Sequence, residues 1–187
     1  MALSTITIHN IETSIADYPI YQYAFFRPQE IMFNDRLRTY CKWNCPHYKT
    51  SWSCPPAIDH MDTCIERCLS YQDGLFFSSI KTALPGNLSE KLGPQQPITT
   101  AHEQLTSRVE SRLTQNGLQL YTLTSSVCDV CRQCTYPKHP CKFPELMHPC
   151  IESHGISIAQ LADLCGMDYY FDEFSALKFS VIFIRGV

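Results

Sequence analysis

The spacing of hydrophobic and polar residues along the chain predicts both strands and helices. Apolar residues that alternate or run together predict strands over residues 18–26, 74–80, 118–124 and 177–186. Apolar residues at intervals of three and four predict helices over residues 58–69, 101–115 and 158–165. This mixture, with a short βαβ core, predicts a single α+β domain over residues 1–187, with a mixed sheet and flanking helices.

Residues near the expected helix ends support these boundaries. Two pairs have the spacing of a capping box, Thr100 with Glu103 and Ser157 with Gln160. Gly117 and Gly166 suit helix C-termini. Pro144 and Pro149 suit the first positions of two short helical turns, and the glycine and proline content of residues 84–97 predicts a loop.

Composition and charge narrow the class of protein. The chain has 187 residues, of which 44% are hydrophobic and 18% charged, as in a globular domain. The net charge of −3 argues against a broad nucleic-acid interface. The first twenty residues lack a basic segment followed by an apolar run, and no stretch approaches the ~20 apolar residues of a membrane span. We therefore expect a cytoplasmic protein without nucleic-acid or membrane partners.

The cysteine content changes this picture most. Eleven cysteines in a reducing compartment point to metal or redox chemistry rather than disulfides. Seven of them fall into two groups. We call Cys41, Cys45 and Cys54 the first cysteine group, and Cys128, Cys131, Cys134 and Cys141 the second cysteine group.

The second cysteine group has the spacing C-x2-C-x2-C-x6-C in "CDVCRQCTYPKHPC". Bacterial ferredoxins use the same C-x2-C-x2-C run to hold an iron–sulfur cluster. A structural zinc site usually has two separate C-x2-C pairs, whereas these pairs share Cys131. Arg132, Lys138 and Lys142 would offset the negative charge of a thiolate-ligated cluster. The spacing therefore favours a [4Fe–4S] cluster, with zinc as the alternative.

The first cysteine group has the spacing C-x3-C-x8-C and is followed by two prolines. A disulfide between two of these three cysteines would leave the third unpaired. Prolines indicate a loop, where cysteine burial has no periodicity, so we favour a second metal site. Three aromatic residues would shield that site from water, or would pack on a neighbouring strand: Trp43, Tyr48 and Trp52.

Three thiolates leave one iron of a [4Fe–4S] cluster without a protein ligand. That position is open to a substrate or to a distant side chain, and the candidates are Cys64, Cys68, His47 and His60. Cys64 and Cys68 lie on the apolar stripe of the predicted helix over 58–69, so core positions are expected for both, as for Cys165. The fourth position stays unassigned.

Three segments together resemble a family of small cysteine-rich proteins described as predicted metal-binding, of unknown function, and found largely in anaerobic bacteria and archaea. They are "CKWNCPHYKTSWSCPP", "CDVCRQCTYPKHPCKFPE" and "HPCIESHGISIAQLADLCG". The resemblance implies metal binding at both cysteine groups and supplies no reaction. The family has glycine where this chain has Lys49, which implies a different local turn. It has serine or a small residue at Cys150, which implies that Cys150 is not an essential ligand.

These patterns support three hypotheses for function. In the first, two iron–sulfur clusters pass electrons to a redox partner protein. In the second, the three-cysteine cluster binds a small-molecule substrate and the four-cysteine cluster relays electrons. In the third, zinc stabilises a binding module without catalytic activity. Whether the protein is an enzyme, and which residues would be catalytic, is left open.

Overall fold

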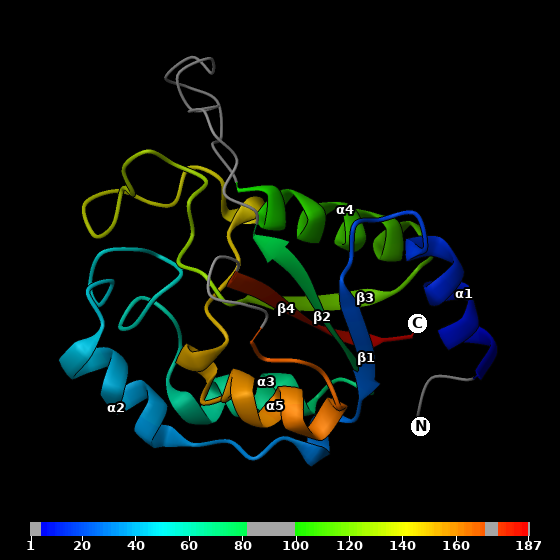
Figure 1. Ribbon diagram of the computed structural model, residues 1–187. Coiled ribbons are helices and arrows are strands. Elements are labelled where there is room, and N and C mark those ends of the chain that lie inside the picture. Colours follow the sequence, from blue (N-terminus) through cyan, green and yellow to red (C-terminus); the bar gives the residue numbers. More distant parts are fainter. Residues whose placement is uncertain (1–4, 82–99, 171–175, 187) are drawn as a thin grey trace.

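The computed structural model describes residues 5–81, 100–170 and 176–186 and shows an α+β domain (Figure 1). Its helices are α1 (Thr5–Ile15), α2 (Asp35–Asn44), α3 (Met61–Leu69), α4 (Ala101–Gln115) and α5 (Ile158–Cys165). Its strands are β1 (Gln22–Phe26), β2 (Asp73–Lys81), β3 (Gln119–Thr124) and β4 (Ala176–Arg185). Within these ranges no helix combines the length and the apolar character that crossing a bilayer requires.

The strands form one sheet in the order β1-β2-β4-β3. All three strand pairs are antiparallel, so the sheet is not mixed as expected. Strands β2 and β3 both run antiparallel to β4 and are therefore parallel to each other. The connection β2–α4–β3 is the expected βαβ unit in split form, with β4 inserted between its strands. Strand β3 lies at an edge of the sheet.

Helices cover both faces of the sheet (Figure 1). Alternate residues of β2 and β4 point to opposite faces, which gives each face its own apolar core. On one face Leu75 and Ile182 pack with Val109 of α4 and Ile11 of α1. The core on the other face includes residues of α3 and α5, with Phe76, Val181, Cys68, Ile158 and Leu161.

The predicted helix boundaries of α4 and α5 are confirmed. The hydroxyl of Thr100 accepts a hydrogen bond from the Glu103 backbone N–H at 3.4 Å, and that of Ser157 accepts from Gln160 at 3.4 Å. Gly117 and Gly166 have φ of +80° and +63°, which glycine adopts without steric strain.

Two helices and one turn differ from the sequence predictions. Helix α2 was not predicted because Cys41 is its one buried residue among the side chains described, so it has no apolar stripe. Helix α1 was not predicted because its sequence "TITIHNIETSI" alternates like a strand. Pro144 begins a 3-10 turn as expected, but Pro149 does not, since the next turn spans Glu152–His154. The predicted loop over 84–97 lies outside the described residues.

Candidate metal centre

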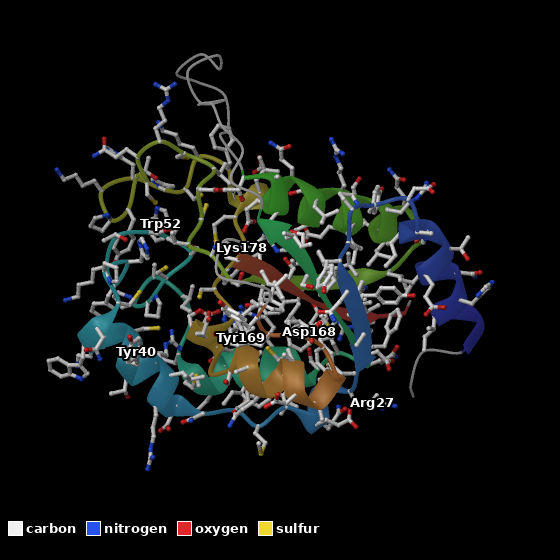
Figure 2. The ribbon with its side chains drawn as sticks, viewed as in Figure 1. Arg27, Tyr40, Trp52, Asp168, Tyr169 and Lys178 are labelled. Carbon is white, nitrogen blue, oxygen red and sulfur yellow. The ribbon has the colours of Figure 1, made fainter. Side chains whose placement is uncertain are left out.

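The two cysteine groups lie next to each other, because their segments are joined by hydrogen bonds and ring contacts. The indole Nε1 of Trp52 (labelled in Figure 2) donates to the His139 carbonyl at 3.1 Å. The Trp52 ring meets that of Tyr136 edge-on, with ring centres 5.0 Å apart. The Cys128 N–H donates to the Ser53 hydroxyl at 3.1 Å. Pairs of residues that are 87 and 75 positions apart in the sequence are thus brought together at one end of the sheet.

Helix α2 and the turns after it build the first cysteine group. Cys41 lies in the last part of α2, and Cys45 caps its C-terminus. The chain then folds back, since the Lys49 N–H donates to the Pro55 carbonyl at 3.0 Å. Lys49 has a φ of +63°, the left-handed conformation that glycine favours. The turn therefore keeps a backbone conformation suited to glycine, although the side chain is lysine.

The thiols of the first cysteine group are close enough to influence one another. The pKa of Cys54 is raised to about 11, chiefly by burial; the neighbouring Cys45, Cys41 and Cys134 contribute to the increase, and a hydrogen bond with Ser53 opposes it. Burial, followed by the charge of Cys45, also raises the pKa of Cys41. Cys134 of the second group is also a neighbour of Cys54, in keeping with the hydrogen bond from the Cys128 N–H to Ser53.

The second cysteine group lies in an irregular segment after β3, where all four cysteines are half-buried. The pKa of Cys128 is raised to about 11, chiefly by burial; a hydrogen bond from the Val130 backbone opposes the increase, and the charges of Asp129 and Cys141 contribute to it. Burial and then the charges of Cys141 and Cys134 raise the pKa of Cys131. Cys128 and Cys131 therefore have other thiols of the group as neighbours, and a positive metal centre would favour their thiolate forms.

The donor chemistry fits a soft metal, because thiolates select zinc or iron–sulfur clusters. Among the described residues, which include every cysteine, no three Cys, His, Asp or Glu side chains lie close enough to hold one metal ion. A tetrahedral zinc ion with Zn–S bonds of about 2.3 Å needs its sulfur ligands within about 4 Å of one another. No disulfide forms among the eleven cysteines, all of which are free thiols.

Two sequence interpretations of the first cysteine group are corrected. Trp43 is 72% exposed, so it does not shield this group from water; Tyr48 and Trp52 are half-buried. Burial of these cysteines in the core was set aside as an explanation of the group, because the segment was expected to be a loop. Cys41 and Cys54 are nevertheless buried, with exposures of 9% and 6%, because α2 and the following turn pack inward.

The candidates for a fourth ligand of the first cysteine group differ in their burial. Cys68 belongs to the apolar core, as expected. Cys64 is also fully buried and accepts a contact from Arg38 Nη1 at 3.9 Å. The side chains of His47 and His60 are exposed. Cys165, expected in the core, is partly buried and packs against it.

Cys150 was not expected near the first cysteine group, yet the structure places it there. Its N–H donates to the Ser53 carbonyl at 3.3 Å, and its thiol donates to Glu152 Oε2 at 2.9 Å. Burial, then the charge and hydrogen bond of Glu152, raise the pKa of Cys150, and Cys54 adds to the increase. A bridge between Thr124 of β3 and Cys150 fixes this position. The sequence gives no signal for that pairing.

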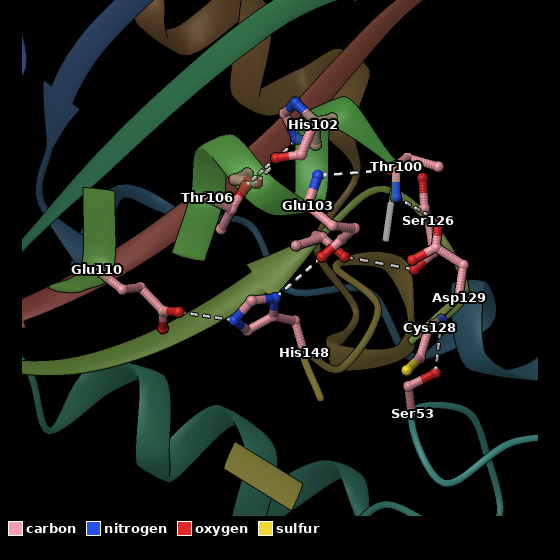
Figure 3. A network of polar contacts seen from close by, with 12 residues as sticks. Ser53, Thr100, His102, Glu103, Thr106, Glu110, Ser126, Cys128, Asp129 and His148 are labelled. Atoms are coloured by element: carbon pink, nitrogen blue, oxygen red, sulfur yellow. Dashed lines mark hydrogen bonds and ion pairs between the residues drawn. The ribbon is translucent and has the colours of Figure 1, made fainter. Parts of the chain in front are cut away.

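A buried polar network beside the second cysteine group was also missed (Figure 3). His148 Nδ1 lies 3.0 Å from Glu103 Oε2, and its Nε2 lies 2.8 Å from Glu110 Oε2. Burial alone would lower the pKa of His148, but hydrogen bonds to both carboxylates and their charges outweigh it and raise the pKa to about 9. Glu103 and Glu110 lie seven residues apart on α4, a spacing that places them on one face. We call these three residues the carboxylate–imidazole triad.

A cleft of about 730 Å³ lies between this triad, β3, α3 and the loop of the second cysteine group. Its walls include Trp52, Leu120 and Met147, and Cys141 lies on its rim. Arg67 on α3 is paired with Asp59 and sits 5.3 Å from the centre of the Tyr121 ring. The volume lies in the range of small-molecule sites, about 300–1,000 Å³.

Comparison with known proteins agrees with the resemblance seen in the cysteine segments. No curated protein and no solved structure matches the chain significantly. One family model, described as a predicted metal-binding protein, matches residues 24–184. That range contains both cysteine groups, Cys150, the triad and the cleft. The chain therefore belongs to this family of predicted metal-binding proteins, DUF2284.

Proposed function

We propose that this protein is an iron–sulfur redox protein in which each cysteine group ligates one [4Fe–4S] cluster. The observation that carries the proposal is the packing of the two groups against each other through Ser53, Trp52 and Tyr136. A cluster at each group would supply a one-electron redox couple. Two adjacent redox couples allow electrons to pass within one small domain. Two structural metal sites would not need to lie next to each other.

The residues around the groups suit this role. Ser53 is fully buried and accepts a hydrogen bond from the Cys128 N–H, which holds the start of the second cysteine group in place. Trp52 and Tyr136 cover the contact between the groups and reduce access of water there. Lys138 and Lys142 are exposed next to the second group, where they would offset the charge of a thiolate-ligated cluster. The cytoplasm, where thiols stay reduced, is the compartment we expect.

The first cysteine group decides between an electron carrier and an enzyme. If the protein supplies only Cys41, Cys45 and Cys54, one coordination position stays open to a small-molecule substrate. If Cys150 supplies the fourth thiolate, the group is closed and the protein passes electrons to a redox partner. The backbone bond from Cys150 to Ser53 brings Cys150 beside Cys54 and supports the closed arrangement, for which the thiol must exchange its bond to Glu152 for the metal. The redox assignment is common to both.

Metal and sulfide analysis of protein purified without oxygen tests the proposal. We expect about eight irons and eight acid-labile sulfides per chain, a brown colour, and electron paramagnetic resonance signals on reduction. Serine replacement of Cys41, Cys45 and Cys54 together should remove one centre and leave the other, with circular dichroism to confirm folding. Stoichiometric zinc without sulfide would refute the proposal and support a zinc-stabilised binding module without catalytic activity.

A further inference from the structure

We propose that the outer face of α2 docks an acidic electron-carrier protein, which exchanges single electrons with the first cysteine group. This surface, which we call the basic face, consists of Arg36, Tyr40, Lys42 and Trp43 of α2 and Lys49 of the turn that follows. The electron exchange rests on the proposed function, whereas the docking depends only on these side chains. In that exchange a reduced carrier loses one electron and the cluster gains it, and no covalent bond forms or breaks.

Two large aromatic side chains on this face are exposed to solvent. Trp43 is 72% exposed and Tyr40 is 61% exposed, and α2 lies at the periphery of the domain (Figure 1). They are three residues apart and so share one side of the helix, whereas Cys41 between them is buried. Tryptophan is highly buried on average in folded proteins, and tryptophan and tyrosine are enriched at protein interfaces. The pair is therefore typical of a surface that another protein covers.

The charge around the basic face has one sign. Residues 36–56 contain four basic residues and no aspartate or glutamate, and residues 130–143 contain three more basic residues and again no acidic one. These two segments hold both cysteine groups. All 18 acidic residues of the chain lie outside them, and the nearest to the basic face in sequence is Asp35. A chain with a net charge of −3 thus gathers positive charge around its cysteines.

The cations of the basic face are not neutralised by carboxylates. Arg36, Lys42 and Lys49 form no ion pair with any described residue. The Nζ atoms of Lys42 and Lys49 instead lie 5.1 and 5.5 Å from the ring centres of Trp43 and Tyr48. Such contacts hold an ammonium group beside an aromatic ring and leave its charge available to carboxylates of a partner.

A groove beside the basic face suits acidic side chains of that partner. It has a volume of about 550 Å³ and is lined by Lys42, Arg38 and the residues that follow the first cysteine group. Arg38 donates to the Ile58 carbonyl at 3.2 Å, so its charge is not spent on a carboxylate. Asp59 also lines the groove, but it is paired with Arg67 of α3. The groove therefore keeps the positive character of the face.

A protein fits this surface better than nucleic acid, the other common polyanion. The basic face is small, and the rest of the chain is acidic, so a long polyanion would meet repulsion beyond the face. An acidic protein with a limited contact area meets the face alone. It also comes close to the first cysteine group, because Cys41 and Cys45 lie two residues before and after Trp43.

Isothermal titration of the full chain, prepared without oxygen and with its metal content measured, tests the docking. The probes are a plant-type [2Fe–2S] ferredoxin, which is an acidic electron carrier, cytochrome c, which is a basic one, and a short DNA duplex. We expect ferredoxin to bind one-to-one and at least tenfold more tightly than the other two, and high salt to weaken this binding several-fold. No binding of ferredoxin, or equal or tighter binding of cytochrome c or DNA, would overturn the proposal.

Titration detects docking without electron transfer, so its outcome is independent of the proposed function. Protein that holds zinc and binds ferredoxin would keep the docking and refute the iron–sulfur assignment, and protein that holds clusters but does not bind would do the reverse. With clusters present, electrons should pass between protein and ferredoxin in at least one direction, followed by electron paramagnetic resonance. Transfer in neither direction would refute the electron exchange.

Two variants with matched controls assign the residues. Lys42→Glu and Trp43→Ala should each weaken ferredoxin binding at least fivefold. The controls are Arg112→Glu, exposed on α4, and Tyr23→Ala, exposed on β1, both on the opposite side of the molecule from α2 (Figure 1), and they should change it less than twofold. Unchanged affinity in both test variants, or an equal loss in Arg112→Glu, would refute the assignment. All four side chains are exposed, and circular dichroism confirms that the variants fold.

Discussion

The carboxylate–imidazole triad should make the stability of this protein depend on pH in a defined way. His148 is 6% exposed and contacts Glu103 and Glu110 at 3.0 and 2.8 Å. Its pKa is raised from 6.5 to about 9, because the hydrogen bonds and charges of the two carboxylates outweigh the opposing effect of burial. The difference between 6.5 and about 9, at about 1.4 kcal/mol for each pKa unit, corresponds to about 3 kcal/mol of folding free energy.

The sign follows from which state binds the proton more tightly. The folded state holds the proton on His148 more tightly than the unfolded state does, so protonation stabilises the fold. This contribution is complete below pH 6.5, where both states are protonated, and it is lost as the pH rises to about 9. The variant His148→Gln has no such titration. The wild-type advantage should therefore shrink by about 3 kcal/mol between pH 6 and pH 9.5.

Urea unfolding of both proteins across this pH range measures the effect. The comparison is made as the difference between wild type and His148→Gln, because the cysteines titrate in the same range and cancel in that difference. His9→Gln serves as the control, since the His9 side chain is exposed on α1 and its loss should leave the difference near zero at every pH. A wild-type advantage that stays constant from pH 6 to 9.5 would show that His148 is not held as an imidazolium.

Four further changes test other parts of the structure. Cys150→Ala should alter the resonance signal or iron content of the first cysteine group, whereas Cys165→Ala should leave both unchanged; equal behaviour would remove Cys150 as a fourth ligand. Lys49→Val should unfold at lower urea than Lys49→Gly, by at least about 1 kcal/mol, because a left-handed backbone costs non-glycine residues about 1–2 kcal/mol. Ser53→Ala should cost about 1–3 kcal/mol in a urea melt, because the Cys128 N–H loses its acceptor. Thr122→Val should keep stability or raise it by up to about 1 kcal/mol, because the buried Thr122 hydroxyl lacks a hydrogen-bond partner among the described residues. A marked loss of stability would mean that this hydroxyl has an internal partner.

Much of the fold follows from local pattern. The helices that were predicted have an apolar stripe, and two of them also have a capping hydroxyl, Thr100 in α4 and Ser157 in α5. Helix α2 has a cap at Asn34 but no apolar stripe. It is held by contacts to segments far along the chain, such as the bond from the Asn34 N–H to the Gly155 carbonyl. Periodicity detects burial along one element, so it misses a helix that buries a single cysteine.

The candidate site was only partly visible in the sequence. Spacing indicated both cysteine groups, because ligands of one metal centre often lie close in sequence. Nothing in the sequence indicated that Ser53 meets Cys128, or that Cys150 pairs beside β3, since these contacts depend on the path of irregular segments. The seven-residue interval between Glu103 and Glu110 was a usable signal for a shared helix face. The sequence carried no such signal for His148, because this residue comes from a segment 38 residues beyond Glu110.

Strand β3 lies between the segment of Cys150 and the cleft. An exposed edge strand invites pairing with another chain, and proteins usually cover or interrupt such edges. Here the residues around Cys150 cover the edge at Thr124, so the end of the strand is protected by the segment that approaches the first cysteine group. The edge at Thr122 is left to the cleft, where its buried hydroxyl lacks a partner among the described residues. Because Cys141 also lines this cleft, the uncovered part of the edge lies beside the second cysteine group.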